Sequence, residues 1–255
     1  MSTIVNAVDE DRLVSLTQQL IRIDSQYYGE GARHSEITAF LKDLCGSLGF
    51  EVHCAEPEEG FPLVVARLRG KIGKPVLAFM GHYNTVPIYD RSKWSFDPLG
   101  AEIRNGRIWG RGSADMKQAI AAMIEASRAI MESGTDLKGD LLLVFFAGEG
   151  KHYPALEYMV GPGRSYAGAD WYIDADGRSG LGLIRGGSMG SIELRIRGST
   201  GHIAYFRDDG TKPVNAISKM VRLLSRIEQI DDWMTYKTHP LFDRPWRYSN
   251  KPIFE

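Results

Sequence analysis

Six consecutive apolar residues, LLLVFF at 141–146, constrain the fold of this chain more than any other feature. An uninterrupted apolar run of this length suits a β-strand that is covered on both faces, as in sheets with helices on each side. Helical apolar spacing occurs at residues 11–23, 35–48 and 115–131. Further strand-like runs occur at residues 63–69, 76–80 and 171–173. The pattern predicts an α/β fold with a mixed, largely parallel sheet between helices.

The sequence pattern changes near residue 187. Residues 192–197 alternate apolar and polar side chains, which is typical of a strand with one solvated face, and an amphipathic helix is expected at 214–230. We therefore predict two domains. Residues 1–186 form the first, and residues 187–255 form the start of a smaller α+β domain that is incomplete.

Composition excludes several classes of partner. The 31 basic and 32 acidic residues give a net charge of −1 without a basic block, which argues against nucleic-acid binding. No apolar run approaches the ~20 residues that a membrane-spanning helix needs. The charged residues at 9–12 do not suit a signal peptide, and two cysteines are too few for a disulfide framework. We expect a cytoplasmic protein.

Polar residues that can bind a metal follow the predicted strands. His82, Glu149 and Asp176 each come shortly after one of the strand-like runs, and Asp115 opens the predicted helix at 115–131. Ligand sites in α/β sheets gather at the carboxyl ends of strands. One histidine and two carboxylates can bind a divalent transition metal and leave a position for water. Taken singly, each residue also fits a structural role, such as a helix cap for Asp115.

Several segments of the chain resemble motifs of the M20 metallopeptidase family, which includes aminoacylases, carboxypeptidases and acyl-amino-acid deacylases. They are GHYNTVP at 81–87, WSFDP at 94–98, NGRIWGRGSADMK at 105–117, FAGEG at 146–150, ADWYIDAD at 169–176, GSTGH at 198–202 and PVNAI at 213–217. They occur in the family's order, which makes the resemblance more specific than any single motif.

The resemblance implies a role for each matching residue. His82, Asp115 and Asp176 would bind one divalent transition metal ion, either Mn or Zn, with Asp174 as the alternative to Asp176. Glu149 would be the general base. His202 would belong to a lid domain and reach the active site of the other subunit, so a homodimer or larger oligomer is expected.

The sequence departs from the family pattern at three points. Asn84 replaces an aspartate that orients the metal-binding histidine, so the Asn84 side chain is expected to accept a hydrogen bond from the imidazole of His82. Gly150 replaces a glutamate ligand of a second metal, and His152 could substitute for it, although we predict a single-metal centre. The chain also ends within the lid, so its remainder could be a separate chain, or this chain could be a fragment.

The expected activity is hydrolysis of a C–N bond by metal-activated water. We expect a small-molecule substrate with a carboxylate, bound by Arg185 and Asn215. Aromatic residues in the loops favour deamination of an aromatic amine such as 5-nitroanthranilate, with peptide or N-acyl-amino-acid hydrolysis as the alternative. A non-catalytic dimerising scaffold with a decayed site is the alternative of another class.

Overall fold

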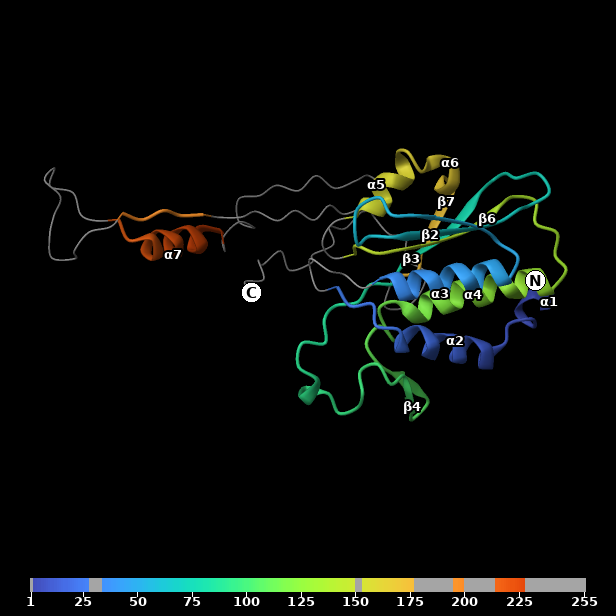
Figure 1. The fold of residues 1–255 in the computed structure, drawn as a ribbon, viewed down its shortest axis with the longest axis horizontal. Coiled ribbons are helices and arrows are strands. Elements are labelled where there is room, and N and C mark those ends of the chain that lie inside the picture. The colour runs from blue at the N-terminus through green and yellow to red at the C-terminus, as the bar shows by residue number, and fades with distance from the viewer. Residues whose placement is uncertain (1, 28–33, 150–152, 177–194, 200–213, 228–255) are drawn as a thin grey trace, which may run out of the picture. The chain divides into compact units, whose positions relative to one another are not determined.

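The structure is a computed structural model that describes residues 2–27, 34–149, 153–176, 195–199 and 214–227 (Figure 1). The chain divides into two compact units, Met1–Ile184 and Arg185–Glu255. This division falls two residues before the boundary predicted at 186/187. The assignment of the second unit as an incomplete lid domain stays a prediction.

A five-stranded mixed sheet forms the centre of the first unit, in the order β1-β2-β6-β3-β7. Its strands are β1 (Glu51–Ala55), β2 (Leu63–Leu68), β3 (Leu77–His82), β6 (Leu141–Phe146) and β7 (Trp171–Asp174). The β1/β2 and β2/β6 pairs are antiparallel, whereas β3 is parallel to both β6 and β7. The predicted α/β class with a mixed sheet is confirmed.

The apolar run at 141–146 is the central strand β6, and all its residues are buried. Leu143 and Phe145 belong to the apolar cluster on the side of α3 (Ser35–Ser47) and α4 (Lys117–Glu132). The alternate residues of β6 belong to a second cluster, which includes residues of α5 (Pro154–Val160) and α6 (Arg164–Ala167). Figure 1 shows these two helix pairs on opposite sides of the sheet. Burial on both faces is the reason that no polar residue interrupts the run.

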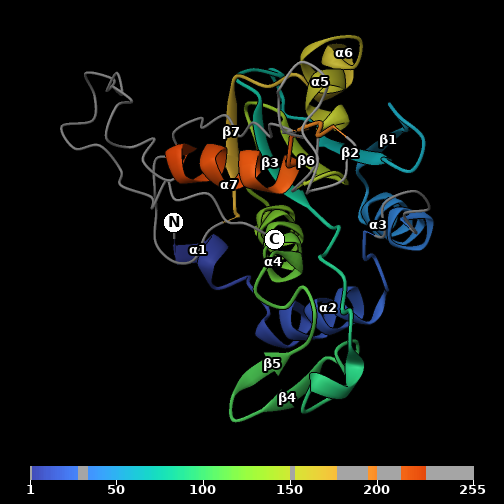
Figure 2. The ribbon, with the colours of Figure 1, turned by 90° about the vertical axis from the view of Figure 1, so that its left-hand side faces the viewer.

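Helix α2 (Glu10–Arg22) forms an outer layer on the side of α3 and α4. It packs on α4, and Figure 2 shows α4 lying between α2 and the sheet. Asp9 caps α2 by accepting a hydrogen bond from the backbone N–H of Arg12 at 2.9 Å. The remaining short elements are α1 (Ser2–Val5), the 3₁₀ helix Arg91–Lys93, β4 (Glu102–Arg104) and β5 (Arg107–Trp109).

The predicted start of α4 is wrong by two residues. The helix begins at Lys117 rather than at Asp115, because Met116 has a non-helical backbone and Lys117 donates its N–H to the carbonyl of Gly112 at 3.0 Å. The sulfur of Met116 accepts a hydrogen bond from the backbone N–H of His82 at 3.2 Å. This contact with β3 takes the chain out of the helical path, so Asp115 lies before the helix and does not open it.

The strand-like run at 171–173 forms a strand that is not covered on both faces. The strand exists as β7, but all four of its residues are exposed, and the side chain of Trp171 is 68% exposed. Among the described strands β7 pairs only with β3 and forms the edge of the sheet. Apolar character in a short run does not distinguish an edge strand from a central one.

Few residues of the second unit are described. Helix α7 (Ala216–Ile227) lies within the predicted helix at 214–230. The N–H of Ser199 donates to the carbonyl of Val214 at 3.0 Å, and the N–H of Val214 donates to the Ser199 hydroxyl at 2.7 Å. Of the strand predicted at 192–197, residues 192–194 lie outside the described residues and 195–197 have no regular secondary structure.

None of the helices in the described ranges combines the length and apolar character that crossing a bilayer requires. The expectations of no membrane partner and of a cytoplasmic location stay predictions.

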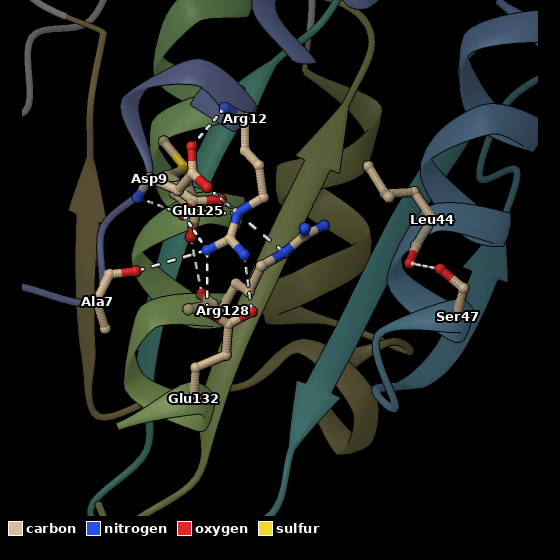
Figure 3. Close-up of polar contacts among 10 residues, drawn as sticks. Ala7, Asp9, Arg12, Leu44, Ser47, Glu125, Arg128 and Glu132 are labelled. Atoms are coloured by element: carbon tan, nitrogen blue, oxygen red, sulfur yellow. Dashed lines mark hydrogen bonds and ion pairs between the residues drawn. The ribbon is translucent and has the colours of Figure 1, made fainter. Parts of the chain in front are cut away.

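An ion-pair network joins the start of α2 to the second half of α4 (Figure 3). Glu125 is buried and accepts hydrogen bonds from the guanidinium of Arg12 at 2.8 Å and from the backbone N–H of Asp9 at 2.9 Å. Arg12 also contacts the half-exposed carboxylate of Glu132 at 2.9 Å. Because Glu125 is buried, its charge depends on these donors.

We predict that Glu125→Gln lowers the free energy of unfolding by roughly 1–3 kcal/mol, because charge-assisted hydrogen bonds to a buried acceptor are lost. The matched variant Glu132→Gln should cost less than about 1 kcal/mol, since that carboxylate is half exposed. Urea denaturation of both variants measures the difference. Equal losses would contradict the assignment of Glu125 as the buried centre of the network.

Candidate metal centre

The parallel strands place three of the predicted site residues at one edge of the sheet. His82 is the last residue of β3 and lies opposite Phe146, the last residue of β6. Glu149 follows three residues after β6, and Asp176 follows two residues after β7. The carboxyl ends of parallel strands lie on the same side of the sheet. These side chains are therefore close together although they are distant in the sequence.

His82, Asp115 and Asp176 form a compact group of donor atoms. The Nε2 atom of His82 lies 3.0 Å from Oδ1 of Asp115 and 3.6 Å from Oδ2 of Asp176. One donor atom from each residue lies within 4.8 Å of the other two. Ligands at about 2.1 Å from a tetrahedral ion are about 3.4 Å apart, so the histidine-to-carboxylate distances suit a shared divalent cation.

The orientation and the tautomer of the His82 imidazole suit the binding of a cation. Its Nδ1 atom lies 3.0 Å from the backbone carbonyl oxygen of Asn84. A carbonyl oxygen can only accept, so this contact places the proton on Nδ1 and directs the lone pair of Nε2 toward the carboxylates. In the described part of the chain Nε2 is buried and has no hydrogen-bond partner. A metal ion would satisfy this atom, so the residues present fit a divalent metal.

The Asn84 side chain does not make the predicted contact with the imidazole of His82. The backbone of Asn84, and not its side chain, contacts the ring of His82. The buried side chain accepts hydrogen bonds from the N–H groups of Gly148 and Glu149 at 3.0 and 3.2 Å, and it donates to the carbonyl of Glu149 at 3.1 Å. An amide can both donate and accept, so Asn84 holds the turn that carries Glu149.

Negative charge is concentrated at the site. Burial raises the pKa of Glu149, Asp115 and Asp176 raise it further, and His82 opposes the shift. Burial also raises the pKa of Asp176, followed by repulsion from Asp115. Burial and the neighbouring carboxylates thus act in the same direction and favour the protonated form of both groups.

The structure also distinguishes Asp176 from the alternative Asp174. Asp176 belongs to the group of three metal-binding side chains, whereas Oδ1 of Asp174 accepts the backbone N–H of Asp176 at 3.0 Å. Asp174 therefore shapes the turn after β7. The choice of Asp176 as the ligand is the one that this geometry favours.

Of the remaining predicted site residues, the structure describes Asn215. Asn215 accepts the N–H of Ser218 at 3.1 Å and caps the start of α7, so its expected contact with substrate stays a prediction. Four residues named in the sequence analysis lie outside the described residues: Gly150, His152, Arg185 and His202.

Two residues beside Asp115 were not predicted to matter. The Met116 thioether contacts the backbone N–H of His82, and a side chain on Gly81 would place its Cβ 2.6 Å from Cε of Met116. Lys117 is buried and donates hydrogen bonds to backbone carbonyls of another helix. The local sequence does not set Lys117 apart, because Gln118, Glu125 and Arg128 are polar residues of the same predicted helix.

Comparison with known proteins places the chain in a family. The sequence profile of "Peptidase family M20/M25/M40" matches residues 78–240. A succinyl-diaminopimelate desuccinylase from Thioalkalivibrio sulfidiphilus is 36% identical over 202 residues, which are 75% of this chain and 51% of that protein. One from Beijerinckia indica is 32% identical over 210 residues, which are 73% of this chain and 50% of that protein. The chain belongs to the M20/M25/M40 peptidase family.

Solved structures agree with this assignment at the level of the fold. A tripeptidase from Staphylococcus aureus has a TM-score of 0.59 at 22% identity, and the match covers 88% of this chain and 59% of that one. The M20 metallo-carboxypeptidase Sso-CP2 from Sulfolobus solfataricus has a TM-score of 0.57 at 22% identity, covering 67% and 38%. The chain spans about half the length of the curated relatives it matches.

We predict that metal affinity weakens as the pH falls toward the range in which carboxyl groups take up protons. Burial and the neighbouring Asp115 raise the pKa of Asp176, so this ligand takes up a proton at a higher pH than an ordinary aspartate, and the proton competes with the metal. Calorimetric titration with Zn²⁺ in buffers of different ionisation enthalpy measures both affinity and released protons. Binding without proton release at the lower pH would contradict the shifts.

We also predict one strongly bound metal ion per chain, because His82, Asp115 and Asp176 are the one such group that the described residues provide. Anomalous scattering from crystals soaked with excess metal tests this. Two strong peaks at about 3.5–4 Å from each other would instead indicate a two-metal centre.

Proposed function

We propose that this protein is a metal-dependent hydrolase that cleaves the amide C–N bond of an N-acyl amino acid or a peptide. The observation that carries the proposal is the cluster of His82, Asp115 and Asp176 with the carboxyl group of Glu149 beside it. A divalent ion such as Zn²⁺ or Mn²⁺ would supply Lewis acidity, which acidifies water and polarises a carbonyl group.

The chain's own residues divide the remaining tasks. His82 would present its Nε2 lone pair because the Asn84 carbonyl holds the proton on Nδ1. Glu149 would accept a proton from the attacking water and then deliver it to the departing amine, and its raised pKa brings it closer to the operating pH. Asn84 would keep Glu149 in place through its three hydrogen bonds to the turn.

The names of the relatives support an amide substrate. They are desuccinylases and peptidases, and the deamination of 5-nitroanthranilate finds no support in them. We therefore place the N-acyl amino acid or peptide, with a carboxylate, ahead of the aromatic amine. The proposal has two further parts. Arg185 and Asn215 would bind the carboxylate of the substrate, and His202 would reach the site from the partner subunit of a lid-mediated homodimer.

A cavity beside the loop that follows His82 could admit such a substrate. It has a volume of about 750 Å³, and its lining includes Tyr27, Tyr89 and Arg91. Volumes of this size suit small-molecule ligands, and an arginine can bind a carboxylate. The lining of the cavity also includes Asp24 and none of the three candidate metal ligands, so a substrate role for this cavity is part of the proposal.

The alternative of another class is a scaffold with a decayed metal site. The three metal-binding side chains, the ring orientation of His82 and the held turn of Glu149 are all present together. Loss of function would not maintain this combination, so we favour the enzyme.

We predict that Glu149→Gln retains metal affinity and lowers kcat by about a hundred- to ten-thousand-fold, because the amide cannot accept the proton from water. Rates on N-succinyl and N-acetyl amino acids, dipeptides and 5-nitroanthranilate, with Zn²⁺ or Mn²⁺ present, identify the substrate class. Glu157→Gln, on the surface helix α5, is a control that should retain activity.

Two results would contradict this proposal. An active Glu149→Gln enzyme would remove Glu149 as the base, and turnover of 5-nitroanthranilate alone would replace the proposed amide substrate with the aromatic amine.

A further inference from the structure

Lys117 is buried at the junction of two helices. It is the first residue of α4, and only 1% of it is exposed. Its Nζ atom donates hydrogen bonds to the backbone carbonyls of Leu20 at 2.8 Å and Ile23 at 2.7 Å. Both carbonyls lie at the C-terminal end of α2, where carbonyl groups lack partners within the helix. Lys117 thus ties the start of α4 to the end of α2.

The position of Asp115 depends on the backbone around Lys117. The Asp115 side chain is 70% exposed, so packing does not fix it, yet its carboxylate lies 3.0 Å from Nε2 of His82. Two contacts hold the segment that carries it. On one side the Met116 thioether accepts the His82 N–H, and on the other side Lys117 contacts α2.

Gly112 shows how closely the lysine stem fits this loop. The backbone N–H of Lys117 donates to the Gly112 carbonyl at 3.0 Å. A Cβ atom on Gly112 would lie 2.9 Å from Cδ of Lys117, and the positive φ of +87° also favours glycine there. The loop before Asp115 is therefore packed against the buried part of the lysine.

We infer that Lys117 is a positioning residue for the metal ligand Asp115: its two hydrogen bonds to α2 fix the start of α4 so that Asp115 meets His82. This inference rests on the proposed metal site. It differs from a purely structural role because it predicts an effect on metal binding that other contacts between the same two helices do not have.

The same pair of helices provides a matched control. Glu125 also joins α2 to α4, through Arg12, but it lies in the part of α4 that faces the start of α2. Removal of either the Lys117 hydrogen bonds or the Arg12–Glu125 ion pair weakens the contact between the helices. Of these two contacts, only that of Lys117 lies two residues from the candidate metal ligand Asp115.

The experiment compares Lys117→Met and Glu125→Gln with the parent chain. Lys117→Met retains most of the length of the side chain and removes the donors. We expect Lys117→Met to weaken Zn²⁺ affinity by about 10–100-fold, the range for residues that orient metal ligands. Glu125→Gln should change it by less than about threefold although it also lowers stability. Competition with a chelating dye, well below the unfolding temperature, measures the affinity.

Amide hydrogen exchange gives a second measurement that needs no metal. In the metal-free protein, Lys117→Met should accelerate exchange in the segment 112–117, whereas peptides from β6 should exchange as in the parent. Lys117→Arg retains hydrogen-bond donors but with different geometry, so it should lie between the parent and Lys117→Met in both measurements. If Lys117→Met does not fold, Lys117→Arg carries the test.

The outcomes separate this inference from the proposed function. The inference is overturned if a folded Lys117→Met variant has the same Zn²⁺ affinity as the parent and the same exchange rates at 112–117. Where only Lys117→Arg folds, the same result in that variant overturns it. Equal loss of affinity in Glu125→Gln would also overturn it, because the effect would then follow from lower stability. A parent chain that binds no Zn²⁺ would refute the proposed function, and exchange at 112–117 would still decide whether Lys117 fixes this segment.

Discussion

The parallel register of β3, β6 and β7 is the constraint on which the candidate site depends. Because the three strands run in the same direction, residues that follow them reach one edge of the sheet. His82 lies at the end of β3, and the turns after β6 and β7 carry Glu149 and Asp176. The antiparallel pairs of β1 and β2 extend the sheet on the other side and contribute no ligand to this group. The central strand β6 holds the register because helices bury both of its faces.

Asp115 is the ligand that the sheet does not position. It precedes a helix, and its carboxylate is largely exposed. Its backbone is held by Met116 against β3 and by Lys117 against α2, so the metal centre depends on the layer of helices as well as on the sheet. In this arrangement the outer helix α2 influences the geometry of a site that it does not line.

Several carboxylates lie close together at the site. Burial and the neighbouring carboxylates raise the pKa of Glu149 and of Asp176, and the Nε2 lone pair of His82 faces Asp115 and Asp176. Asn84 adds order without adding charge, because its amide satisfies both N–H groups and the carbonyl at the Glu149 turn. A carboxylate at this position could accept the two N–H groups but could not donate to the carbonyl.

The sequence by itself determined the α/β class and the fully buried strand at 141–146, because apolar periodicity is a local signal. The strand ends also predicted that His82, Glu149 and Asp176 lie near one another, and the resemblance to family motifs assigned their roles. The sequence also contained the Asn105–Gly106 signal of the hairpin between β4 and β5, where both residues have positive φ, although that hairpin was not predicted. Only the tertiary structure decided that β7 is an exposed edge among the described strands, that α4 starts after Asp115, and that Asn84 contacts the Glu149 turn. These three features depend on contacts between segments that are distant in the sequence. The local pattern of a single sequence does not show which distant segments are in contact.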